Sequence, residues 1–304
     1  MSVSRVEVIG IKLPLISPGD DLAKLIVEYA ERSGVGIREG DVVVVTEKVV
    51  SKSLGLMVDA DSVEPSSYAL RLSRAVGLDP RFVELVVREC DGVLAVVPIR
   101  DLVRDGVVDL ESLAYDREAA RKLLEEYPCF FIVEKEGMLW SDSGIDASNA
   151  PPGKYVIPPK NHDDIAREMH ERIRELTGRY VAVVICDTEF FLDGSIDFAR
   201  GSWGIDPADR LFGAPDLYGK PKYGGVDIVV HEVCSAAALL MRQTKEGVPV
   251  AIVRGLSYRR VDRGLRQSLP KIDLEKAVAK TLKATLKIRG FKWLIRALLR
   301  TLTD

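Results

Sequence analysis

Hydrophobic and polar positions follow two different periods along the chain. Residues 42–45 are four consecutive valines, and such a continuous apolar run is typical of a strand covered on both faces. Residues 22–30 instead carry apolar side chains three and four positions apart, which predicts an amphipathic helix that ends near Gly34. Asp79 and Pro80 have the residue types of an N-cap and a first helical position. The first half also predicts strands at 3–9 and 92–99, helices at 80–90 and 116–127, and a hairpin at 129–140.

The second half repeats the alternation. Residues 162–176 predict a helix that Gly178 ends, and residues 180–186 predict a short buried strand. Residues 187–225 are rich in Gly and Asp and lack apolar periodicity, which indicates a long loop of the kind that is often functional. The pattern closes with a strand at 226–230, a helix at 232–242 and a strand at 248–253. Together these elements favour a mixed α+β fold with large sheets.

The composition is that of a soluble globular protein. Of the 304 residues, 47% are hydrophobic and 29% are charged, and no apolar run approaches the roughly 20 residues of a membrane helix. The first residues lack the pattern of a signal peptide, so we expect a cytoplasmic protein. The cysteines are scattered without Cys-x-x-Cys spacing, so we expect four reduced thiols and no zinc site: Cys90, Cys129, Cys186 and Cys234.

Charge divides the chain unevenly. Residues 271–304 hold nine basic and three acidic residues, a net charge of +6, although the whole chain carries −3. Apolar residues recur at helical spacing between the basic ones, which predicts two amphipathic helices separated by Gly290. We expect these helices to pack on the body or on a partner subunit. Attachment to a membrane surface or to nucleic acid is the alternative that the basic faces leave open.

Two acidic clusters are candidates for chemistry. Asp187 and Thr188 follow an apolar strand, so a carboxylate and a hydroxyl meet at a sheet edge, where they could bind Mg²⁺. Residues 141–149 contain two acids, three serines and an Asn, which could supply a second metal carboxylate and an amide for a nucleoside. Alternatively, Asp187 only caps a turn, and residues 141–149 form an Asx-rich turn.

A third candidate is the segment at residues 46–52, which follows the valine strand. A lysine at this position could pair with a phosphate as a point charge, or it could be an ordinary solvated surface lysine. The chain has no Walker A motif, and its glycine-rich segment at 34–40 lacks GxGxxG spacing. Any nucleotide is therefore held in another way.

Taken in order, these segments resemble the GTP-dependent F420-0:L-glutamate ligases, which attach glutamate to the deazaflavin coenzyme F420. The resemblance spans roughly residues 3–256, and the Gly-Ile-Asp-x-Ser-Asn segment followed by Asp-Thr is its most specific part. The matching segments are Leu13–Ile16, Gly19–Leu22, Asp41–Val45, Lys48–Lys52, Gly144–Asn149, Ile185–Thr188, Asp216–Gly219, Glu232, Leu239–Met241 and Val253–Leu256.

The resemblance implies an α+β F420 γ-glutamyl ligase-like fold with mixed and antiparallel sheets and flanking helices, in a homodimer. It also implies GTP and a divalent cation, Mn²⁺ or Mg²⁺. In such enzymes the nucleotide phosphorylates a carboxylate of a small acid acceptor, and the amine of L-glutamate attacks the acyl phosphate. No protein nucleophile is needed, which agrees with the absence of a Ser-His-Asp or Cys-His signature.

The resemblance also implies two sets of site residues. Four residues fall where the family holds its metal: Asp146, Asp187, Thr188 and Gln243. Five residues fall where the family borders its nucleotide: Leu13, Pro14, Thr46, Lys52 and Asn149.

One segment departs from the family. After Asp-Thr the family usually carries Phe-Gly-Arg-Pro-Trp-Arg, whereas this chain continues with Glu189 and with Asp193 in place of the two arginines, and His231 stands where an Asp usually precedes Glu232. Two acids would repel an anionic acceptor. The departure motivates an alternative function, a non-catalytic nucleotide- or metal-binding paralogue whose basic tail mediates interactions.

These observations predict a ligase domain at residues 1–257 and a basic helical extension at 258–304. The first predicted function is a GTP- and metal-dependent ligase that forms a γ-glutamyl amide on F420-0 or a related small acid.

Overall fold

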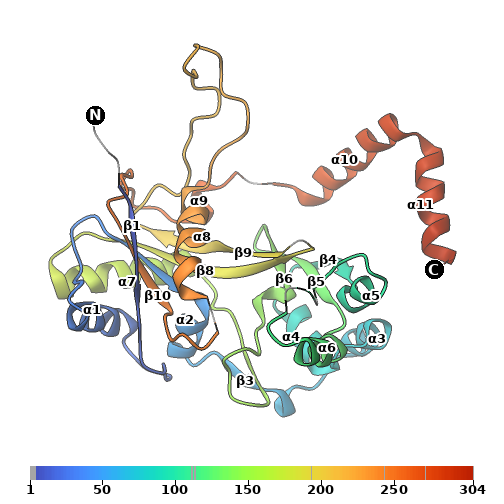
Figure 1. Cartoon of the computed structure of the whole chain (residues 1–304), viewed down its shortest axis with the longest axis horizontal. Helices are drawn as coiled ribbons and strands as arrows, with labels where there is room; N and C mark the ends of the chain where they lie inside the picture. The colour runs from blue at the N-terminus through green and yellow to red at the C-terminus, as the bar shows by residue number, and fades with distance from the viewer. Residues whose placement is uncertain are drawn as a thin grey trace. The chain divides into compact units, whose positions relative to one another are not determined.

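The centre of the protein is a five-stranded sheet (Figure 1). The structure is a computed structural model that describes residues 5–110, 112, 114–192, 194–242, 244–270 and 272–303. The strands of the sheet lie in the order β1 (Glu7–Ile11), β10 (Val250–Arg254), β2 (Val42–Thr46), β8 (Ala182–Phe191) and β9 (Gly194–Trp203). Strands β2 and β8 are parallel, and the other neighbours are antiparallel. The parallel pair places Thr46 beside Cys186, so the segments that follow both strands begin at the same edge of the sheet.

Helices cover both faces of this sheet. Val43 and Val45 face helices α1 (Leu22–Arg32) and α7 (His162–Thr177) in one core cluster. Val42 and Val44 face helix α8 (Val229–Met241) and the short helix α9 (Leu265–Ser268) in the other. Alternate residues of one strand therefore fill two cores, which explains why the valine run contains no polar position. The α+β class and the mixed sheet that the sequence predicts are both confirmed.

A smaller region of the chain forms two further sheets. Its three-stranded sheet has the order β4 (Gly92–Val97), β5 (Phe130–Lys135) and β6 (Met138–Ser141). Strands β3 (Met57–Asp59) and β7 (Lys154–Val156) form a separate pair. The helices of this region are α3 (Ser67–Val76), α4 (Pro80–Arg88), α5 (Ile99–Arg104) and α6 (Arg117–Glu126). Asp79 caps α4 as predicted, because its carboxylate accepts a hydrogen bond from the Arg81 backbone N–H at 2.7 Å.

The predicted loop at 187–225 is wrong in its first part. Strand β8 continues through Asp187 to Phe191, and β9 returns beside it from Gly194. The Gly and Asp residues that resemble loop formers are here paired through their backbones, which composition does not reveal. The predicted strand at 226–230 is also wrong, because α8 already begins at Val229.

The expectation of four reduced thiols is wrong as well. Cys186 of β8 and Cys234 of α8 form a disulfide with their Cα atoms 5.7 Å apart. Cys90 and Cys129 are free. The two bonded cysteines are separated by 48 positions, so only the packing of α8 on the sheet brings them together.

The chain separates into two units. One comprises residues 1–135 and 139–269, and the other comprises residues 136–138 and 270–304. Leu265 is fully buried in the second core cluster, so the first unit continues past the domain boundary predicted at residue 257. The second unit contains the two predicted basic helices, α10 (Leu274–Arg289) and α11 (Phe291–Thr303). Among the described residues, no helix has the length and apolarity to cross a membrane.

Candidate active site

Helix α2 (Glu47–Ser53) begins directly after β2 at the shared sheet edge. Its residues Lys48 and Lys52 are four positions apart and therefore project from the same face of the helix. Both line a cavity of about 260 Å³. All five predicted nucleotide residues line this cavity, which we call the lysine cavity, together with Lys245: Leu13, Pro14, Thr46, Lys52 and Asn149.

Two contacts connect the lysine cavity to the segment at 146–149. The Lys52 ammonium donates a hydrogen bond to the Asn149 carbonyl at 2.5 Å, and the Asn149 amide donates to the Thr244 carbonyl at 3.2 Å. Burial, and next the nearby positive charge of Lys48, lower the pKa of Lys52. The lysine is thus a partly desolvated charge held at a cavity wall, and not the solvated surface lysine of the alternative interpretation.

A larger cavity of about 720 Å³ also lies at this edge. Three of the four predicted metal ligands line it: Asp146, Asp187 and Thr188. We call it the aspartate cavity. Gln243, the fourth predicted ligand, lies outside the described residues. Asp146 and Asp187, which come from distant parts of the chain, therefore share one cavity.

The electrostatics of Asp187 reflect this proximity. Burial raises its pKa to about 7, the charge of Glu47 and more weakly that of Asp146 act in the same direction, and the charge of Arg200 opposes them. Asp146 accepts an ion pair from Lys48 at 2.5 Å and a hydrogen bond from the Ser148 backbone N–H at 2.6 Å. The segment is thus an Asx-type turn and a cavity wall at the same time.

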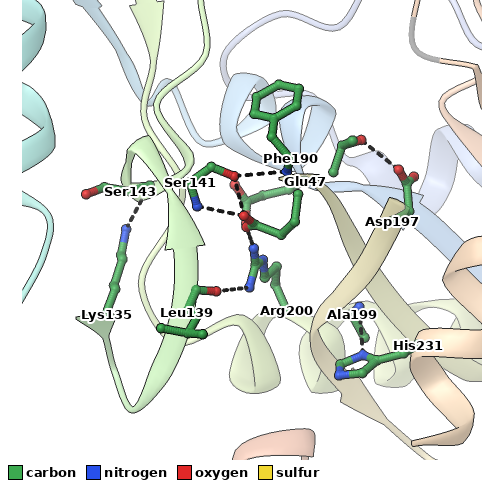
Figure 2. A network of polar contacts seen from close by, with 12 residues as sticks. Glu47, Lys135, Leu139, Ser141, Ser143, Phe190, Asp197, Ala199, Arg200 and His231 are labelled. Carbon is green, nitrogen blue, oxygen red and sulfur yellow. Dashed lines mark hydrogen bonds and ion pairs between the residues drawn. The ribbon is translucent and has the colours of Figure 1, made fainter. Parts of the chain in front are cut away.

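Thr188 and Asp197, which both line the aspartate cavity, are hydrogen-bonded to each other. The Thr188 hydroxyl donates to the Asp197 carboxylate at 2.6 Å (Figure 2). Over the residues that the structure describes, no group of three or more His, Cys, Asp or Glu side chains has the arrangement of a metal centre. The predicted set differs from such a group, because it combines two carboxylates with a hydroxyl and an amide.

Glu189 does not act as the sequence predicts. Its carboxylate is buried, forms an ion pair with Arg200 of β9, and accepts hydrogen bonds from the backbone N–H and the hydroxyl of Ser141. Arg200 also donates to the Leu139 carbonyl at 3.3 Å (Figure 2). Its guanidinium carbon lies 3.6 Å from the centre of the Trp140 ring. The charge of Glu189 is therefore neutralised inside the protein and does not repel an acceptor. Asp193, the other acid of this departure, lies outside the described residues.

Two buried groups under the site were not predicted from the sequence. The Glu47 Oε2 atom lies 2.6 Å from the His162 Nε2 atom, and both side chains are buried. Arg200 is buried between Glu189 and Trp140. Neither belongs to a recognisable motif. The i, i+4 spacing of Lys48 and Lys52 is a signal that could have predicted helix α2 and the common face of the two lysines.

Unusual backbone conformations cluster around the two cavities. Asp142 and Arg242 line the aspartate cavity, Asn149 lines the lysine cavity, and all three have positive φ angles, of 46°, 46° and 53°. Ser143, next to Asp142, has a φ of 58°. Residues other than glycine rarely adopt this region, and such residues concentrate at functional sites.

Comparison with known proteins identifies the family of this chain. Residues 10–255 match the family described as F420-0:Gamma-glutamyl ligase. A coenzyme F420:L-glutamate ligase of Methanopyrus kandleri is 36% identical over 244 residues, which cover 79% of this chain and 83% of the relative. The ligase of the same name from Archaeoglobus fulgidus is 32% identical over 285 residues, covering 93% of this chain and 100% of the relative. The ligase of the same name from Methanothermobacter thermautotrophicus is 30% identical over 280 residues, which cover 90% of this chain and 98% of the relative.

The family match and the three relatives, each named as a ligase, define an enzyme of the ligase class, which forms amide bonds. The chain belongs to the F420-0:gamma-glutamyl ligase family.

Proposed function

We propose that the protein is a GTP- and divalent-metal-dependent ligase that joins L-glutamate to coenzyme F420-0 or a related small acid. The amide bond forms between a carboxylate of the acid and the glutamate amine, and it is a γ-glutamyl bond where that carboxylate is the γ-carboxylate of a glutamate. The names of the relatives support F420 and glutamate. One observation carries the rest of the proposal. The cavity lined by Asp146 and Asp187 adjoins a cavity lined by all five predicted nucleotide residues, and the ion pair between Lys48 and Asp146 lies between them.

The lysine cavity suits a nucleoside triphosphate. Lys48, Lys52 and Lys245 supply positive charge for the phosphates, while Leu13 and Pro14 offer an apolar wall. The Thr46 side chain adds a hydroxyl at the end of β2. We place the triphosphate toward the lysines, because this end borders the aspartate cavity through Lys48.

The aspartate cavity suits Mn²⁺ or Mg²⁺. Both are hard cations that prefer carboxylate and hydroxyl oxygens, and Asp146, Asp187 and Thr188 present such oxygens to one space. Asp187 is partly buried near the like charges of Glu47 and Asp146, so a cation would offset an unfavourable concentration of negative charge. When bound, the cation neutralises the charge that develops during phosphoryl transfer.

The chain's own residues then have positioning roles. Lys48 and Lys52 hold the phosphates, while the aspartate cavity receives the acceptor carboxylate that is phosphorylated. GDP leaves as the acyl phosphate forms. Glutamate enters the same cavity, and its amine forms a C–N bond at the acyl carbon while the C–O bond to the phosphate breaks, so phosphate leaves and the amine proton passes to solvent. No serine or cysteine nucleophile is required, because the acceptor carboxylate itself attacks phosphorus.

The direct test is a turnover assay. The full chain is incubated with GTP, Mn²⁺, L-glutamate and F420-0, and GDP and a glutamylated product are measured. Arg117→Ala, an exposed position on α6, serves as a matched control for the variant Asp187→Asn. Product from the wild type and from Arg117→Ala, but not from Asp187→Asn, supports the proposal. Absence of both GDP and product from the wild type would refute it.

We also propose that the protein is a homodimer, and the segment at 208–227 supports this. It extends from the body between β9 and α8 (Figure 1), and the bridges Asp209–Asp227 and Pro215–Pro221 hold its two sides together. Leu217, Tyr218 and Tyr223 are 100%, 87% and 95% exposed. Large apolar side chains exposed in this way are typical of an interface. Light scattering should give twice 33.6 kDa for the wild type and a smaller mass after replacement of these three residues by Ser.

A further inference from the structure

Arg242 occupies the boundary between the two cavities. It directly follows Met241, the last residue of α8. Arg242 lines the aspartate cavity together with Leu239, whereas Met241 and Thr244 line the lysine cavity. A group bound by the Arg242 side chain would therefore lie in the cavity that also contains Asp146 and Asp187.

The charges around the aspartate cavity make this arginine distinctive. The described residues that line the aspartate cavity include a single base, Arg242, and four acids: Asp142, Asp146, Asp187 and Asp197. Within the described part of the chain, the guanidinium makes no ion pair with a carboxylate, and its Nε donates a long hydrogen bond of 3.4 Å to the Leu239 carbonyl of its own helix. An anion that enters this cavity meets its only positive lining side chain, among the described residues, at Arg242.

The backbone at Arg242 adds an independent observation. Its φ of 46° and ψ of −12° lie in the left-handed region, which glycine adopts without steric cost and arginine does not. Glycine is the common residue at this position after a helix. The chain therefore carries an arginine where conformation alone favours glycine, and the strain indicates a role for the side chain.

We propose that Arg242 is a specificity-determining residue that binds a carboxylate of one of the two acid substrates. This inference rests on the proposed function, because the reaction joins two carboxylate-bearing molecules. A guanidinium can hold a carboxylate through two parallel hydrogen bonds, which fixes its orientation as well as its position. The two sources of the carboxylate are the acceptor and glutamate, and the test separates them.

The test compares the wild type with Arg242→Gly, Arg242→Lys and the control Arg117→Ala. Equilibrium binding of F420-0 and of L-glutamate is measured separately, with Mn²⁺ and a non-hydrolysable GTP analogue present. We expect one of the two to bind Arg242→Gly about 10- to 100-fold more weakly, with a smaller loss in Arg242→Lys and none in Arg117→Ala. Affinity for the GTP analogue should stay the same.

Thermal melting separates this role from a structural one. Because glycine relieves the left-handed backbone, Arg242→Gly should melt at the same temperature as the wild type or about 2 °C higher. Equal affinity of the wild type and Arg242→Gly for both acids, including the case in which neither acid binds, overturns the inference. An Arg242-dependent affinity without turnover would instead refute the proposed function and retain the role of Arg242.

Discussion

Lys48 and Asp146 form an ion pair of 2.5 Å in which each partner belongs to a different cavity. Lys48 comes from the helix after β2, and Asp146 comes from the segment after β6. The same lysine also donates to the Ser148 hydroxyl at 2.5 Å. One side chain thus holds the turn at 146–148 against helix α2, and this contact keeps the two cavities adjacent.

Replacing Lys48 by Met should weaken nucleotide binding. The change removes a charge from the lysine cavity and also releases Asp146 and Ser148, so we expect the dissociation constant for GTP to rise about tenfold or more. Calorimetric titration with GTP and Mn²⁺ measures this. Lys154→Met on β7, which changes an exposed lysine, is the matched control. Identical GTP affinity in wild type and Lys48→Met would contradict the assignment of the lysine cavity to the nucleotide.

Asp146 and Asp187 should both be needed for cation binding. Asn has nearly the same shape as Asp without the charge, so Asp146→Asn and Asp187→Asn should each lower Mn²⁺ affinity and reduce ligase activity at least about 100-fold. Mn²⁺ binding is followed by electron paramagnetic resonance. Asp164→Asn on α7 controls for the loss of an acidic residue. Wild-type Mn²⁺ affinity in either site variant would remove that residue from the metal site.

Loss of the disulfide should destabilise the fold. The bond between Cys186 and Cys234 closes a segment of 48 positions, and the chain-entropy relation gives about 4 kcal/mol for a loop of that size as an upper value. We therefore expect a lower free energy of unfolding for Cys234→Ala and for the wild type in reducing buffer, measured by urea denaturation. Cys90→Ala, which removes a free thiol, should have a much smaller effect. A reductant that leaves the urea midpoint unchanged would argue against this bond.

Asp142 should make stability depend on pH. Burial raises its pKa to about 7, so in the folded state it keeps a proton that the unfolded chain releases above about pH 4. The free energy of unfolding should therefore fall as the pH rises from about 4 to 7. Asp142→Asn lacks the titrating group and can still accept the hydrogen bond from the Phe131 backbone N–H.

The difference between Asp142→Asn and wild type should consequently grow with pH. We expect the variant to be about 1–3 kcal/mol more stable than the wild type at pH 8 and nearly equal to it at pH 4. Thermal melting across this range, with Asp164→Asn as the control, measures the difference. A constant difference at every pH would assign the effect to packing and not to ionisation.

The sequence was informative where one segment alone determines the structure. The valines at 42–45 and the apolar stripe at 22–30 predicted a buried strand and its covering helix, because each period reflects local geometry. The cap at Asp79 was local in the same sense. The beginning of α8 was mispredicted because Val226–Val230 is apolar in a way that fits both a strand and a helix.

The candidate site depends on contacts between distant segments, and there the residues alone were insufficient. The residues suggested that segment 141–149 could add a second carboxylate to the Asp187 site, but only the family resemblance selected Asp146, since its proximity to Asp187 follows from the parallel pairing of β2 with β8 and from the Lys48 ion pair. The position of Glu189 could not be predicted, because its partner Arg200 lies on the returning strand of a hairpin that composition indicated to be a loop. The disulfide between Cys186 and Cys234 could not be predicted either, because only the packing of α8 on the sheet brings these two cysteines together.

The bond between Cys186 and Cys234 restricts how the enzyme can open. It fastens the middle of α8 to the strand residue immediately before Asp187, so this helix cannot swing away from the sheet to admit a substrate. The outer half of the β8–β9 hairpin lies beyond this bond and is not held by it. We therefore expect α8 and the adjoining part of β8 to keep their relative position when the aspartate cavity is filled or emptied.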